Sequence, residues 1–94
     1  TAAKGGVASM TRSMAAEYAS EKIRVNAIAP STTLSDRVKK LLEASPEIKA
    51  VSETHLLGLG LPIHIAEMAV YLASDESAIT TGQVLPVDSG VTIV

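Results

Sequence analysis

The 94-residue sequence contains no cysteine, no phenylalanine and no tryptophan, and it has only two tyrosines. The absence of cysteine excludes disulfides and thiolate metal sites and fits a reducing compartment. Apolar residues make up 47% of the chain, so alanine and aliphatic side chains must build any core. No apolar run approaches the roughly 20 residues that a membrane-spanning helix needs, and no charged-then-apolar leader opens the chain. We therefore expect a soluble, cytoplasmic protein.

The sequence also lacks an excess of positive charge: eight Lys and Arg stand against ten Asp and Glu, for a formal net charge of −2. Nucleic-acid binding usually requires a basic surface, so we expect no nucleic-acid partner. The one adjacent basic pair, Lys39-Lys40, is expected on a solvated helix face. His55 and His64 stand apart without cysteine or a His-Glu-x-x-His context, which predicts no metal site.

Residues 1 to 19 have the spacing of a helix that is rich in alanine and glycine. A glycine inside a helix costs about 1 kcal/mol relative to alanine, but it lets another backbone approach closely. The stretch from 2 to 19 is therefore our candidate for a subunit interface. Its predicted apolar face, at steps of three and four residues, consists of Val7, Met10, Met14 and Tyr18.

Two β-branched runs predict parallel strands. The first runs from Ile23 to Ala29 and is halted by Pro30, and the second spans Val84 to Val87. Pro86 lacks an N–H, which favours a sheet edge or a bulge. Between the strands the sequence predicts a helix after the loop 31–35, a second one from Pro46 and a third one from Pro62. The buried stripe of the third helix is predicted to be Ile65, Met68, Ala69 and Leu72. Strand, helical crossover and strand predict a right-handed βαβ unit, and we expect its other strands to lie upstream.

Four stretches, in this order, resemble the short-chain dehydrogenase/reductase family. They are Lys4 to Val7, Ile23 to Pro30, the helix from Pro62 ending Tyr-Leu-Ala-Ser-Asp, and Thr81 through Gly90. The resemblance covers essentially the whole chain. It implies an α/β fold, the C-terminal portion of a Rossmann-type doubly wound parallel sheet with its last two strands and their helices. Residues 1–94 would then be the C-terminal part of a single NAD(P)-binding domain.

By this resemblance Lys4 is the lysine of the family's Tyr-x-x-x-Lys motif, and the catalytic tyrosine belongs immediately before Thr1. Residues four apart share a helix face. A neighbouring ammonium lowers the pKa of a tyrosine from its usual value of about 10 and so aids proton transfer. The resemblance also gives Lys4 a hydrogen bond to the nicotinamide ribose. The simpler alternative is a solvent-facing helix lysine.

Asn26 to Pro30 resembles the family's Asn-x-x-x-Pro-Gly segment, so the following loop is implied to bind the cofactor. Backbone groups around Thr32 and Thr33 would meet the nicotinamide carboxamide, and the hydroxyl of Ser35 would help. Ser31 replaces the usual glycine and would be strained if its φ were positive. Alternatively, the loop caps a helix through Thr33 or Ser35. The implied cofactor-binding set is Lys4, Pro30, Ser31, Thr32, Thr33 and Ser35.

Two further departures from the family pattern concern structure. Val87-Asp88-Ser89-Gly90 resembles a terminal Val-Asp-Gly-Gly, with Ser89 in place of glycine, and we assign it to structure and subunit contacts. Ile63-His64 replaces an acidic pair, so a small loss of stability is expected at the helix N-terminus.

The apolar side chains after the loop would lie in a lid over the substrate or simply pack against one another. They are Leu34, Val38, Leu41 and Leu42.

The resemblance implies an oxidoreductase that transfers a hydride between NAD or NADP and a small carbonyl/alcohol substrate, working as a homo-oligomer (dimer or tetramer). The chain starts at Thr1 without Met and without a helix cap. We therefore expect a fragment that begins just after the tyrosine position and is inactive alone. A second hypothesis is a non-catalytic member of the family that serves as a binding or oligomer-scaffold protein, because a fold does not fix a function.

Overall fold

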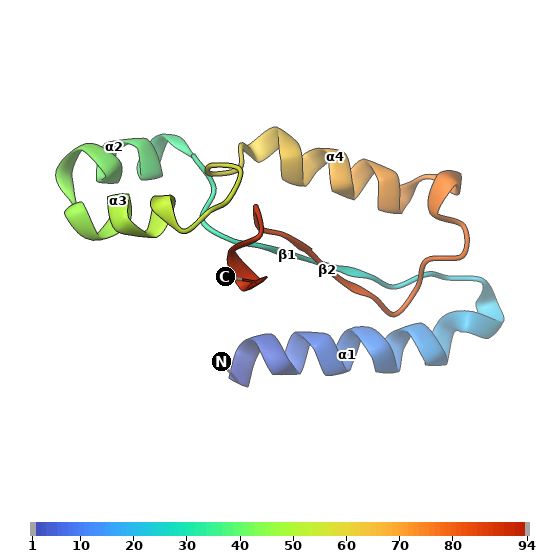
Figure 1. Ribbon diagram of the computed structural model, residues 1–94. Helices are drawn as coiled ribbons and strands as arrows, with labels where there is room; N and C mark the ends of the chain where they lie inside the picture. The colour runs from blue at the N-terminus through green and yellow to red at the C-terminus, as the bar shows by residue number, and fades with distance from the viewer. Residues whose placement is uncertain (1, 94) are drawn as a thin grey trace. The chain divides into compact units, whose positions relative to one another are not determined.

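The structure is a computed structural model that describes residues 2–93 (Figure 1). It divides into two compact units, one formed by residues up to 28 together with 68–85, the other by 29–67 together with the segment from 86 onward. No helix in the described range is long and apolar enough to cross a membrane. The main elements are α1 (Ala2–Tyr18), β1 (Ala27–Pro30), α2 (Asp36–Ala44), α3 (Pro46–Glu53), α4 (Pro62–Ala73) and β2 (Val84–Val87). Short 3-10 turns follow α1 (Ala19–Glu21), α4 (Asp75–Ser77) and β2 (Val91–Ile93).

The strands β1 and β2 pair in a two-stranded sheet. The N–H of Gly82 donates to the carbonyl of Val25 over 2.7 Å, and the N–H of Ala27 donates to the carbonyl of Gln83 over 2.8 Å. The residue number rises along both partners, so the strands are parallel. The α/β fold with two parallel strands is thus confirmed.

The predicted start of the first strand at Ile23 is wrong, because regular pairing begins only at Ala27. Before that point the backbone bond from Gly82 to Val25 is supplemented by side-chain hydrogen bonds. The N–H of Val25 donates to the hydroxyl of Thr81 over 3.1 Å. The amide of Asn26 donates to the carbonyl of Thr80 over 2.9 Å and accepts from the N–H of Gln83 over 3.1 Å. Regular pairing therefore begins directly after Asn26, whose side chain bonds to Thr80 and Gln83.

In the first unit, the buried face of α1 differs in part from the predicted one, of which Met14 and Tyr18 are half-buried. Thr11 and Ala15 are each only 5% exposed, whereas Val7 and Met10 are 53% and 58% exposed. A Cβ added at Gly82 would lie 3.4 Å from the Cβ of Ala15, so α1 packs directly on the backbone there. Hydrophobic periodicity predicts that bulky side chains face inward. The close approach of Gly82 to Ala15 instead favours a small side chain there.

Arg24 closes the C-terminal end of α4 in the same unit. One of its guanidinium nitrogens donates to the carbonyl of Leu72 over 2.9 Å and to the hydroxyl of Ser77 over 2.6 Å. The other donates to the carbonyl of Ser74 over 3.0 Å. The last carbonyls of a helix have no partner within the helix, and a cation there also complements the helix dipole. Of the predicted stripe of α4, Ala69 is exposed and the other three residues are half-buried.

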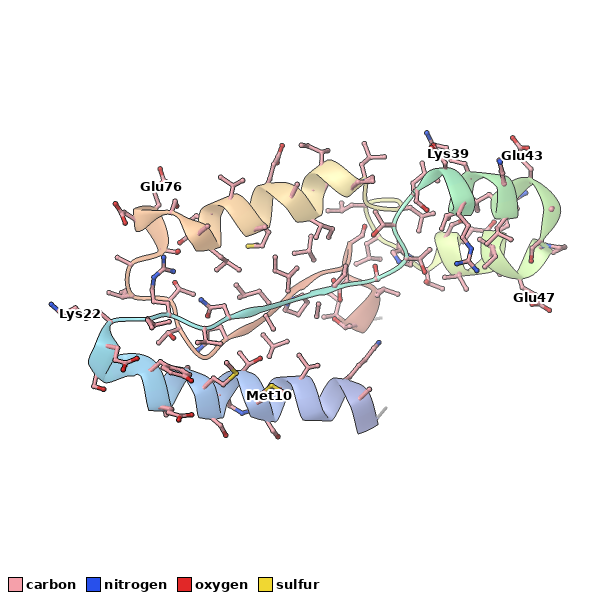
Figure 2. All side chains as sticks on the ribbon, turned by 180° about the vertical axis from the view of Figure 1, so that it is seen from behind. Met10, Lys22, Lys39, Glu43, Glu47 and Glu76 are labelled. Carbon is pink, nitrogen blue, oxygen red and sulfur yellow. The ribbon has the colours of Figure 1, made fainter. Side chains whose placement is uncertain are left out.

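In the second unit, α2 and α3 lie side by side as a helical hairpin (Figures 1 and 2). Pro46 stands at the first turn of α3, as predicted, where its missing N–H costs nothing. Lys39 and Lys40 are both exposed, as expected, and Figure 2 shows Lys39 and Glu43 pointing away from the hairpin.

The N-terminus of α4 has a side-chain contact that partly replaces the missing acidic residue. The Nδ1 atom of His64 accepts a hydrogen bond from the N–H of Leu61 over 2.8 Å. In many helices a Glu or Gln at this position reaches back in the same way. His64 thus supplies the hydrogen bond of the absent acidic residue and offsets part of the expected loss.

Candidate functional site

Lys4 lies exposed near the start of α1 in the first unit. The next two residues, Gly5 and Gly6, are exposed as well, and a Cβ added to either would meet no atom within 4 Å. The described chain therefore leaves the surface beside Lys4 open to a ligand or to another backbone. Pro30 to Ser35 belong to the second unit.

The loop after β1 is fixed at its far end by backbone bonds. Pro30 is the exposed last residue of β1, and the residues from 31 to 35 are half-buried. Thr33 forms an isolated parallel bridge with Gly60, and the N–H of Leu34 donates to the carbonyl of Gly60 over 2.7 Å. The N–H of Ser35 donates to the carbonyl of Thr33 over 2.8 Å, so the loop also turns on itself.

Ser35 is the N-cap of α2, as one of the two alternatives predicted. Its hydroxyl oxygen accepts from the N–H of Val38 over 3.3 Å, and Asp36 places a negative charge in the first helical turn. The hydroxyl of Thr33 instead donates to the carbonyl of Ser31 over 3.1 Å. The capping interpretation therefore holds for Ser35 and not for Thr33.

Ser31 is not strained. Among the described non-glycine residues only Lys22 and Ser89 have a positive φ, at 59° and 55°. The hydroxyl of Ser31 lies 2.9 Å from Nε2 of His55, a side chain that is only 6% exposed. The loop is thus held at its near end by a side-chain pair that spans 24 positions of sequence.

The backbone strain falls on the other serine that stands in place of a glycine. Ser89 adopts a left-handed conformation, which favours glycine because a Cβ there crowds the backbone. Its hydroxyl oxygen accepts from the N–H of Leu57 over 2.6 Å, and its carbonyl accepts from the N–H of Leu56 over 2.8 Å. These two bonds hold Ser89 against the segment after His55.

Asp88, next to Ser89, carries a carboxyl group whose pKa the surrounding groups lower. The pKa of Asp88 lies below its usual value, chiefly because the hydroxyl of Thr92 favours the charged form, with the backbone N–H groups of Gly90 and Thr92 adding to this effect and burial opposing it. Oδ1 accepts from the N–H of Gly90 over 3.0 Å. Oδ2 is buried and has no partner within hydrogen-bond geometry among the described residues.

An apolar hollow of about 390 Å³ opens in the second unit beside these contacts. The hollow is lined by Leu57, Gly58, Leu59, Gly60, His64, Val87 and Ser89.

Within residues 2–93, no group of three or more His, Cys, Asp or Glu could hold a metal ion.

Sequence reasoning missed His55, which it considered only as a metal ligand. The segment that follows His55 is bonded to the loop after β1 through Gly60 and to Ser89 through Leu56 and Leu57. The partners of His55 and Leu57 lie 24 and 32 positions away, so no local pattern could have indicated them.

A family model and individual known proteins both match nearly the whole of this chain. A family model described as enoyl-(acyl carrier protein) reductase matches residues 1–92. The inactive 2-(S)-hydroxypropyl-CoM dehydrogenase 2 of Xanthobacter autotrophicus is 44% identical over 98 aligned positions, which cover 99% of this chain and 43% of that protein. The 3-oxoacyl-[acyl-carrier-protein] reductase FabG of Thermotoga maritima is 42% identical, over 98% of this chain and 37% of its own length.

Solved structures also match nearly the whole of this chain. A short-chain type dehydrogenase/reductase from Mycobacterium ulcerans superposes with a TM-score of 0.86 at 32% identity, covering 96% of this chain and 33% of that one. ElxO, solved with NADP bound, gives a TM-score of 0.84 at 27% identity, covering 97% and 38% of the two chains. The chain therefore spans well under half the length of the proteins that it matches.

Proposed function

Because this chain belongs to the short-chain dehydrogenase/reductase family, we propose that it is part of an enzyme that transfers a hydride between NAD or NADP and a small carbonyl/alcohol substrate. The observation that carries the proposal is the family match over residues 1–92, which includes Lys4 and the loop after β1. A relative solved with NADP supports the choice of cofactor class.

The loop suits a nicotinamide in its position and its chemistry. Ligands of open α/β sheets bind beyond the carboxyl ends of the strands, and the loop starts where β1 ends. Because Ser35 uses its hydroxyl oxygen as an acceptor for Val38, the hydroxyl proton is left for a ligand. In this proposal the backbone around Thr32 and Thr33 meets the carboxamide.

In this proposal Lys4 would assist the proton transfer and take no part in the hydride transfer. The bound cofactor supplies or accepts the hydride. The ammonium of Lys4 would lower the pKa of a tyrosine phenol four residues earlier and hold the ribose, so that a proton moves to or from the substrate oxygen near neutral pH.

The test replaces Lys4 in the intact protein. We expect Lys4→Met to lower kcat/KM by about a hundredfold or more, the scale of general acid–base assistance. Arg12→Met is the matched control, since it removes a positive charge from an exposed position of the same helix. An unchanged kcat/KM in Lys4→Met would reject the assigned role of Lys4.

The isolated 94-residue chain should lack dehydrogenase activity. By family resemblance, the glycine-rich pyrophosphate loop, the catalytic serine and the catalytic asparagine belong upstream. The measurement is NAD(P)H absorbance with a panel of carbonyl substrates. Oxidation of NAD(P)H by the purified chain would contradict the prediction.

A non-catalytic scaffold protein is the second candidate, because one relative at 44% identity is described as inactive. The two candidates differ in one residue, the one encoded immediately before Thr1. A tyrosine there, together with turnover by the intact protein, favours the enzyme. Any other residue, without turnover, favours the scaffold.

We further propose a cytoplasmic homo-oligomer that assembles through α1. Val7 and Met10 are more than half exposed on this helix, beside the small residues near its start. A charged side chain placed at such a contact opposes burial, so Met10→Glu should shift the intact protein toward monomers in sedimentation velocity. A wild-type protein that sediments as a strict monomer would contradict the assembly.

A further inference from the structure

Both serines that stand in place of family glycines donate or accept at the same short turn. The hydroxyl of Ser31 contacts His55, and the hydroxyl of Ser89 contacts the N–H of Leu57. The far end of the loop after β1 reaches the same turn at Gly60 through the N–H of Leu34. We name residues 55–60 the template turn, since both ends of the loop are bonded to it.

The hydrogen bonds of His55 fix which ring nitrogen carries the proton. Nδ1 lies 2.9 Å from the carbonyl of Val51, and a carbonyl only accepts, so Nδ1 must be the donor. The hydroxyl of Thr54, 3.4 Å from Nδ1, cannot supply a proton to it because that proton already goes to the Val51 carbonyl over 2.7 Å. Whenever the ring carries a single proton, Nε2 therefore presents its lone pair to Ser31.

Ser31 is then the donor of the pair. Its hydroxyl has one proton and two neighbouring acceptors, Nε2 of His55 at 2.9 Å and the carbonyl of Asp88 at 3.4 Å. The shorter contact lies within the normal range and the longer one at its limit. Because His55 is 6% exposed, water does not compete freely for Nε2, and the direction of the bond is set by the protein.

We propose that His55, held as the Nδ1–H tautomer by Val51, is a positioning residue that orients Ser31 and so fixes the loop 31–35 for the nicotinamide ring. This inference rests on the proposed function for its ligand. Its structural half, the tautomer and the hold on the loop, stands on the contacts alone.

Two isosteric variants separate the bonds of His55. Counted from Cβ, the amide of Asn ends where Nδ1 does, and the amide of Gln ends where Nε2 does. His55→Asn can keep the bond to Val51 and loses Ser31, whereas His55→Gln can keep Ser31 and loses Val51. Ser31→Gly removes the hydroxyl without touching the ring, and it serves if His55→Asn does not fold.

The first measurement needs no activity. A ¹⁵N–¹H spectrum of the imidazole of the intact protein should show a protonated Nδ1 and an unprotonated Nε2. Amide exchange at Leu34 should rise by about tenfold in His55→Asn and Ser31→Gly, the change expected for one lost hydrogen bond, and stay near wild type in His55→Gln. A protonated Nε2 in the neutral ring, or equal exchange in the Asn and Gln variants, would overturn the inference.

The second measurement uses steady-state kinetics of the same proteins. The KM for the nicotinamide cofactor should rise by about tenfold in His55→Asn and Ser31→Gly, with kcat changed less, and His55→Gln should restore it to within about threefold. A merely structural role would lower the melting temperature of both His55 variants without this split. If the tautomer and exchange results hold while KM is unchanged, the positioning stands and the assignment of the loop to the cofactor is rejected.

Discussion

The N–H of Leu57 donates to the hydroxyl oxygen of Ser89 over 2.6 Å, while the backbone of Ser89 sits at a φ of 55°. A serine is unfavourable in this conformation, yet its hydroxyl is what Leu57 needs as a partner. The strain and the hydrogen bond therefore belong to the same residue and oppose each other in the stability of the second unit.

Substitutions at Ser89 separate these two effects. Ser89→Ala keeps the strained backbone and loses the bond, so the free energy of unfolding should fall by about 1 kcal/mol. Ser89→Gly loses the bond but relieves strain of about 1 kcal/mol, so its stability should stay close to that of wild type. Chemical unfolding of the intact protein measures both. An alanine variant as stable as the glycine variant would mean that φ of Ser89 is not positive in solution.

Gly90 and Gly58 form a natural pair for a second test, because both have a φ of +79°. A Cβ at Gly58 would meet no atom within 4 Å, while one at Gly90 would lie 2.7 Å from Cδ1 of Leu56. Gly58→Ala should cost about 1 kcal/mol for the backbone alone. Gly90→Ala should cost about 1 kcal/mol more for the steric overlap. The extra cost should vanish when Leu56→Ala is added, and a persistent difference would locate the clash elsewhere.

Arg24 should be one of the more sensitive surface-accessible positions. Arg24→Met leaves the carbonyls of Leu72 and Ser74 without their charged partner, so the free energy of unfolding should fall by about 2 kcal/mol. Arg24→Lys keeps one donor group and should lose about half of that. Arg12→Met, at an exposed site of α1, should change stability by less than about 0.5 kcal/mol. Equal effects at both arginines would argue against the capping role.

The lowered pKa of Asp88 predicts that the stability of the protein depends on pH. Its folded-state pKa is lowered from 3.8, first by the hydroxyl of Thr92. A group with a lowered folded pKa contributes stability above its unfolded pKa and loses it as the pH falls through the folded pKa. Stability should therefore decline below pH 3.8. Asp88→Asn and Thr92→Val should each flatten this decline in acid-unfolding curves, and an unchanged curve in both variants would contradict the shift.

The sequence predicted the elements well, because their signals are local. Pro46 and Pro62 mark helix starts, and Val84 to Val87 forms the strand that its β-branched residues indicated. The first strand was predicted too early because Ile23 and Val25 have the right composition. Only the side-chain bonds of Asn26 to the distant residues 80 and 83 show that regular pairing starts one residue later.

The face of α1 and the supports of the loop could not be read from spacing. Hydrophobic periodicity favours Val7 and Met10, yet the helix buries Thr11 and Ala15. At Ala15 the neighbouring Gly82 allows a closer approach than a large side chain would. The sequence alone shows that Ser31 stands in place of the family's glycine after Pro30. Its partner, a histidine far along the chain, becomes visible only in three dimensions. The roles of Lys4 and of the loop toward a cofactor stay predictions.

The template turn imposes a constraint on length rather than on composition. His55 and Gly60 each hold one end of the loop, so inserting or deleting a residue between them would move one anchor against the other and twist the loop out of register. Leu57 is 90% exposed and bonds to Ser89 through its backbone N–H, so a change of its side chain should leave that bond in place. At Leu57 the turn should therefore tolerate a change of side chain, whereas a change in the length of the turn should displace the loop.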